Sequence, residues 1–192
     1  MKETLGFVTI ILSIVGHVPY IIDTVRGKTK PHIFTWIIWS IITLLAFLGQ
    51  WVKGGGAGSW GTGVTGVMAI CITIFALKKG TKDITLSDKI FFIWALLAII
   101  PWYLTKDPTI SIVIAVIIDA SAFIPTIRKT IKSPKSETFT TYSLNVIRHV
   151  LSFIALEKYN LATVLYPVYL LGMNFIISTI MLKSYIVKKQ KI

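Results

Sequence analysis

Seven stretches of about 20 mostly apolar residues follow one another along this chain, and they constrain its fold more than any other feature. They span about residues 5–25, 33–52, 57–77, 87–104, 108–127, 138–157 and 161–182. Roughly 20 apolar residues let a helix cross a hydrocarbon core of about 30 Å. A hydrophobic fraction of 54% is also too high for a soluble chain of this length. Because a helix satisfies its own backbone in lipid, we predict an all-α integral membrane protein with seven transmembrane helices.

Basic residues are concentrated in alternate connections between these stretches. Four segments that fall on one side of a seven-helix bundle hold most of them: 26–30, 78–89, 128–135 and the tail after 182. The positive-inside rule therefore predicts that this side is cytoplasmic, with the N-terminus outside and the C-terminus inside. The net charge of +12 then requires no nucleic acid, because a basic cytoplasmic face suits anionic membrane lipid.

One segment of the sequence is echoed about a hundred residues later. IVGHVPYIIDTVRGKTKPHIFTW at 14–36 and AFIPTIRKTIKSPKSETFTTY at 122–142 share a layout of proline, basic loop, and hydroxyl plus aromatic residues. A shift of 106 residues aligns Pro19 with Pro125. A proline kinks a membrane helix, and two kinks at equivalent places favour hinges about which two half-bundles rock. The alternative is that each kink only improves static packing.

The echo predicts two like-oriented units of three helices, residues 1–80 and 107–192, joined by a linker helix within 81–106. The second unit also carries the basic tail. This 3+1+3 layout resembles the SWEET and PQ-loop superfamily, although the family's Pro-Gln dipeptide reads Pro19-Tyr20 and Pro125-Thr126 here. Members are mostly transporters of small solutes; some carry sugars, some carry amino acids with protons, and one branch binds trafficking signals. The resemblance therefore implies a membrane transporter that works by alternating access.

Polar residues at mid-depth of the apolar stretches are the best guide to a site. An Asp or Arg at the centre of a bilayer costs about 2.5–3.5 kcal/mol, so such residues usually face the bundle interior. Asp119 and Arg148 are the two opposite charges at this depth, and we expect them to approach each other or to share water. The alternative is a structural ion pair that locks two helices together. His17, Asp119 and His149 also raise the possibility of proton coupling.

A polar stripe on the stretch 138–157 favours a wet cavity over dry packing. The stripe comprises Thr138, Thr141, Tyr142, Asn145, Arg148, His149 and Ser152 at helical spacing. The equivalent positions of 33–52 are more aromatic, and Trp39 is the candidate stacking face. Together they predict a midplane site for a sugar, nucleoside or amino acid. The predicted substrate-binding residues are Trp39, Asp119, Asn145, Arg148, His149 and Asn174.

Several function classes are disfavoured by what the sequence lacks. The three histidines lie on different predicted helices, which argues against a metal site, and no cofactor motif is present. No nucleophile lies beside a base in a known motif, so we do not expect an enzyme. The open alternatives are a proton-coupled amino-acid or vitamin-type carrier, and a receptor or scaffold that moves nothing. The expected partners are a small-molecule substrate and membrane lipid. A homo-oligomer is compatible with the sequence. Short loops and the absence of a eukaryotic sorting signal indicate a prokaryotic cytoplasmic membrane.

Overall fold

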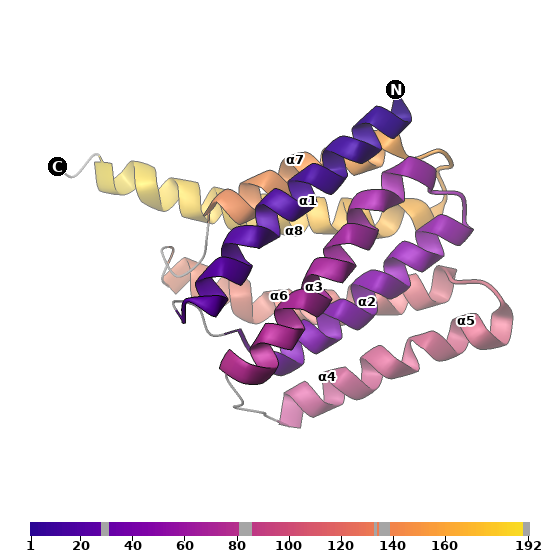
Figure 1. Cartoon of the computed structure of the whole chain (residues 1–192), viewed down its shortest axis with the longest axis horizontal. Helices are drawn as coiled ribbons and strands as arrows, with labels where there is room; N and C mark the ends of the chain where they lie inside the picture. Colours follow the sequence, from indigo (N-terminus) through magenta and orange to yellow (C-terminus); the bar gives the residue numbers. More distant parts are fainter. Residues whose placement is uncertain (28–30, 81–85, 133, 135–138, 190–192) are drawn as a thin grey trace.

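The computed structural model describes residues 1–27, 31–80, 86–132, 134 and 139–189, and within these residues it is helical and contains no strand (Figure 1). The elements are α1 (Lys2–Val25), α2 (Ile33–Val52), the short 3₁₀ helix η1 (Gly56–Ser59), α3 (Trp60–Lys79), α4 (Leu86–Leu97), α5 (Ile99–Thr105), α6 (Thr109–Lys132), α7 (Phe139–Ala155) and α8 (Leu161–Lys189). In Figure 1 the helices run roughly side by side, and the C-terminal end of α8 extends beyond the bundle.

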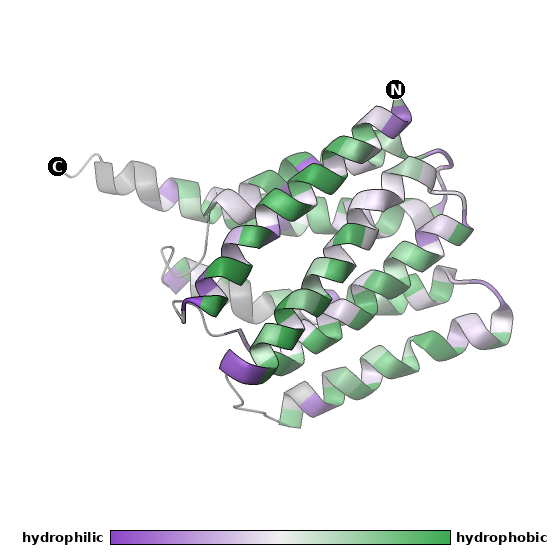
Figure 2. Ribbon diagram, viewed as in Figure 1, coloured by the Kyte–Doolittle hydropathy of each residue, from purple (hydrophilic) through white to green (hydrophobic). Residues whose placement is uncertain are grey.

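Four helical spans among the described residues are long and apolar enough to cross a membrane: Lys2–Val25, Ile33–Val52, Gly56–Lys79 and Leu161–Ser184. The other apolar helical segments are shorter, and α7 has only 17 residues. Apolar residues predominate along the helices (Figure 2), and large apolar side chains such as Phe7, Ile11 and Phe175 are more than half exposed. Apolar surface on this scale is typical of a protein embedded in lipid. The chain is therefore an all-helical, membrane-embedded protein.

The helices form two triplets, α1 to α3 and α6 to α8, and the two triplets pack in the same way. The third helix of each triplet packs against both of the others, α3 against α1 and α2, and α8 against α6 and α7. The triplets meet through α1 against α7 and α2 against α6. Exchanging α1 with α6, α2 with α7 and α3 with α8 maps these pairs onto one another. The helices α4 and α5 break the pattern, because they pack along α2 and α6 at one side of the bundle (Figure 1).

The stretch 87–104 was expected to be a single helix, and the structure has helix over this stretch with one interruption. A break at Ala98 separates α4 from α5. Pro101 explains the position of the break, because proline cannot donate the backbone hydrogen bond that a continuous helix needs. The first four backbone N–H groups of a helix have no acceptor within that helix. Because α5 starts at Ile99, Pro101 lies in its first turn, where its missing N–H costs no hydrogen bond.

Candidate functional site

A cavity of about 360 Å³ lies between the two helix triplets. Its lining comes from α1, α2, α3, α6, α7 and α8. The predicted site residues Trp39, Asp119, Asn145, Arg148, His149, Asn174 and His17 all line it. Of the two predicted hinges, Pro19 lies at an exposed position of α1 and does not line the cavity. The side chain of Pro125 in α6 lies outside the described residues.

Positions that line the cavity come in pairs separated by the repeat distance of 106 residues. The pairs are His17 and Phe123, Thr35 and Thr141, Trp36 and Tyr142, Trp39 and Asn145, and Thr43 and His149. The cavity therefore lies where equivalent faces of the two triplets meet. The paired positions are chemically different. Trp36, Trp39 and Thr43 of α2 are matched by the more polar Tyr142, Asn145 and His149 of α7, whereas His17 of α1 is matched by the apolar Phe123 of α6.

Arg148 is only 2% exposed and is held by neighbours on its own helix. Its Nε donates to Oδ1 of Asn145 over 3.0 Å, and its Nη2 lies 2.8 Å from Nε2 of His149. A guanidinium can only donate, so Nε2 of His149 accepts and a neutral His149 carries its proton on Nδ1. Nη1 of Arg148 and Nδ1 of His149 are then buried donors without a hydrogen-bond partner. The pair has hydrogen-bonding capacity that the protein does not fill.

His17 adds a third nitrogen base beside this pair. Its Nδ1 lies 2.7 Å from the carbonyl oxygen of Ser13 on the preceding turn of α1. A carbonyl only accepts, so Nδ1 carries the proton and Nε2 is left as an acceptor. His17 interacts electrostatically with Arg148, as does His149, so the basic groups of α1 and α7 gather at one wall of the cavity.

Asp119 belongs to a different wall. Its side chain is 2% exposed, and its Oδ2 has no hydrogen-bond partner. Two buried donors, Nε1 of Trp39 and the hydroxyl of Tyr169, lie close enough to interact with this carboxylate, but neither meets the distance and angle of a hydrogen bond. Asp119 and Arg148 are both described residues, and no ion pair joins them. A direct ion pair is therefore absent between these two described residues, because Asn145 and His149 hold Arg148 along α7. The alternative, that the two charges share water, stays a prediction.

Aromatic rings form a continuous row through the bundle. Tyr20 and Trp36 have ring centroids 5.0 Å apart, and Trp36 and Trp39 are 5.1 Å apart in an edge-to-face arrangement. Trp39 then contacts Phe123 at 6.3 Å, and Phe123 contacts Tyr169 at 6.2 Å. Such spacings are those of favourable aromatic pairs. The row provides the cavity with ring faces on the side that also holds Asp119.

Sequence reasoning missed the contribution of α8 beyond Asn174. Tyr166 is 2% exposed, lines the cavity, and its hydroxyl lies 3.1 Å from Oγ1 of Thr43 on α2. It interacts electrostatically with both Asp119 and Arg148. The signal was present in the sequence, because Tyr166, Leu170 and Asn174 recur every four residues and lie on one helix face.

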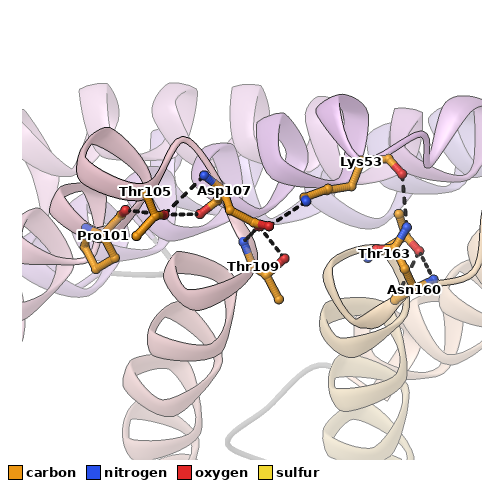
Figure 3. Close-up of polar contacts among 7 residues, drawn as sticks. All are labelled: Lys53, Pro101, Thr105, Asp107, Thr109, Asn160 and Thr163. Carbon is orange, nitrogen blue, oxygen red and sulfur yellow. Dashed lines mark hydrogen bonds and ion pairs between the residues drawn. The ribbon is translucent and has the colours of Figure 1, made fainter.

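The connections at one end of the bundle are joined by polar contacts (Figure 3). Nζ of Lys53 lies 2.7 Å from Oδ2 of Asp107, and Nδ2 of Asn160 donates to the Lys53 carbonyl oxygen over 3.0 Å. The backbone of Lys158 donates to the Gly54 carbonyl over 3.0 Å. The hydrogen bond from Lys53, with those from Thr109, lowers the pKa of Asp107 to about 2. We call the contacts among Lys53, Gly54, Asp107, Lys158 and Asn160 the loop latch.

The cavity extends away from the loop latch. On α2 its lining runs from Thr43 at mid-helix to His32, which caps the first turn of the helix. On α7 it runs from His149 back to Thr141 near the start of the helix. Both helices start at the end of the bundle that carries the basic connections. Comparison with protein-family models, with curated proteins and with solved structures finds no match for this chain, so the cavity itself carries the functional argument.

Proposed function

We propose that this protein is a membrane transporter that carries a small polar solute by alternating access. The observation that carries the proposal is the cavity: it lies between the triplets and extends from mid-helix toward one end, and the loop latch lies at the other end, outside its lining. A carrier needs such a site, accessible from one side at a time. The arrangement is that of a carrier with its latched end closed.

The proposal includes seven membrane spans, with α4 and α5 together forming the fourth. The exchange in the packing pairs supports two like-oriented triplets in a 3+1+3 layout, as in the SWEET and PQ-loop superfamily. The basic connections support an inward C-terminus, which puts the loop latch outside and the open end of the cavity in the cytoplasm. Pro19 and Pro125 serve as hinges in this scheme, one in the first helix of each triplet.

The lining supports a solute of the sugar, nucleoside or amino-acid class. Small-molecule sites usually occupy about 300–1,000 Å³ and combine apolar or aromatic walls with a few polar groups. The present cavity lies at the lower end of that range and combines the row of rings with Asn145, Arg148 and His149. The substrate-binding roles of Trp39, Asp119 and Asn174 belong to the same proposal.

Flux across sealed liposomes tests the proposal directly. Purified protein is reconstituted, and the uptake of labelled sugars, nucleosides and amino acids is compared with uptake into protein-free liposomes. We expect at least one solute to be taken up, and we expect the variant Trp39→Ala to reduce its flux. The matched control is Trp51→Ala, which replaces an exposed tryptophan at the end of the same helix. Solute binding without any flux would instead support a receptor, and would overturn the transporter proposal.

A further inference from the structure

We infer that the solute is a zwitterion, with its cationic group bound on the Asp119 wall and its anionic group bound on the Arg148 wall. This inference rests on the proposed function, because it assigns the chemistry of the same cavity. It is carried by one feature that a sugar carrier does not need. The cavity is lined by one carboxylate and one guanidinium that do not neutralise each other.

The Arg148 wall has the chemistry of an anion subsite. Nη1 of Arg148 and Nδ1 of His149 are buried donors without partners, and the Oδ1 of Asn145 fixes the guanidinium through Nε. A carboxylate accepts several hydrogen bonds at once and forms its strongest ones with a guanidinium. An unpartnered buried donor is unfavourable, and more so if it is charged. An incoming carboxylate relieves that cost at both residues.

The Asp119 wall has the chemistry of a cation subsite. Asp119 is the acidic residue that lines the cavity, and its Oδ2 lacks a partner. Phe123, one turn further along α6, and Trp39 across the cavity present rings 6.3 Å apart. Ring faces and a carboxylate together attract an ammonium group, which interacts with the negative face of an aromatic ring and with the opposite charge. An ammonium that binds here compensates the buried carboxylate.

Charge balance distinguishes a zwitterion from the other solute classes. A neutral sugar leaves both buried charges uncompensated, and a simple cation or anion leaves one of them. A buried charge without a partner is strongly unfavourable. Only a molecule that carries both signs satisfies the two walls together. Tyr166 lines the same cavity and interacts electrostatically with both charged residues.

The test measures how ligands stabilise the full-length protein in detergent, by the shift of its thermal unfolding midpoint. The probes are L-leucine and L-phenylalanine, each compared with its amide, which lacks the carboxylate, and with its N-acetyl form, which lacks the ammonium. Glucose and uridine represent the neutral classes. We expect at least one zwitterion to bind ten times more tightly than either of its blocked forms. Equal binding of the blocked forms, or stabilisation by the neutral solutes alone, would overturn the inference.

Two variants assign the subsites. Asp119→Asn should remove the preference for the zwitterion over the N-acetyl form while keeping the preference over the amide. Arg148→Gln should do the reverse. If either variant fails to fold, the ligand series on the unaltered protein still decides the question. Flux of a neutral solute in liposomes with no zwitterion preference would refute this inference and leave the transporter intact. Zwitterion binding without flux would refute the transporter and leave this inference intact.

Discussion

The guanidinium of Arg148 is bound to the imidazole of His149, the next residue along the same helix, with Nη2 and Nε2 2.8 Å apart. Adjacent residues on a helix point in directions about 100° apart, so this contact requires the arginine to curve back along α7. Asn145, one turn earlier, accepts from Nε and completes the clamp. The helix itself thus positions its one buried charge, and no acidic partner is needed for that purpose.

Asn145→Leu should impair binding at the Arg148 wall, because it removes the acceptor for Nε at similar volume. A hydrogen bond to a charged group contributes about 1.5–3 kcal/mol, which corresponds to a loss of about tenfold or more in apparent affinity. The measurement is the concentration dependence of solute flux in liposomes. Ser143→Ala is the matched control, since the Ser143 hydroxyl bonds only to the Phe139 carbonyl among the described contacts on α7. Equal affinities for the two variants would contradict the clamp.

Gly58→Ala should destabilise the protein, because η1 contacts α7 directly at this glycine. An added Cβ would lie 2.6 Å from both the backbone nitrogen of Leu156 and the carbonyl oxygen of Ser152. Backbone atoms cannot rotate away, and overpacking of this kind costs about 1–3 kcal/mol. Gly172→Ala in α8 is the control, since nothing lies within 4 Å of its added Cβ. Thermal unfolding in detergent should show a lower midpoint for Gly58→Ala only; matching midpoints would refute the close contact.

The helical, membrane-embedded character could be predicted from the sequence, because apolar runs of about 20 residues are rarely found outside membrane-spanning helices. The sequence missed the break at Ala98, which depends on where the chain can best accommodate Pro101. The count of seven spans and their orientation remain predictions. The charge pattern supports both predictions. However, α7 has only 17 residues, so its length and composition alone do not show that it spans the membrane.

For the site, the sequence identified the polar residues of the cavity but not their connections. Depth and spacing placed Asp119, Asn145 and Arg148 near one another, and all three line the cavity. Opposite charges suggested an ion pair, whereas the side-chain rotamer of Arg148 favours its own helix. Rotamer choice depends on the packed surroundings, which no spacing rule contains. Tyr166 was missed for a related reason, because a tyrosine in an apolar run is as typical of packing as of a site.

Acidification should weaken the loop latch through Asp107. Lys53 and Thr109 lower the pKa of this carboxylate from 3.8 to about 2 in the folded protein. A depressed pKa means that the stabilising contribution is fully present above about pH 4 and is lost as the pH falls toward 2. Thermal unfolding midpoints measured through this window should therefore fall more for the unaltered protein than for Asp107→Asn. Lys53→Met should flatten the response only in part, because the hydrogen bonds from Thr109 to Asp107 remain. Parallel curves for all three proteins would show that the contact contributes nothing.

Locking the loop latch covalently should stop transport. In a Cys71→Ala background, Lys53→Cys and Asn160→Cys place two thiols where the Asn160 amide now donates to the Lys53 carbonyl over 3.0 Å. A short bifunctional thiol reagent that can be cleaved by reduction would hold the latched end shut. Alternating access requires this end to open once per cycle, so flux should be lost on cross-linking and restored by reductant, while each single-cysteine variant stays active. Full flux in the cross-linked protein would show that the solute does not pass the latch, and the proposed cycle would then be wrong.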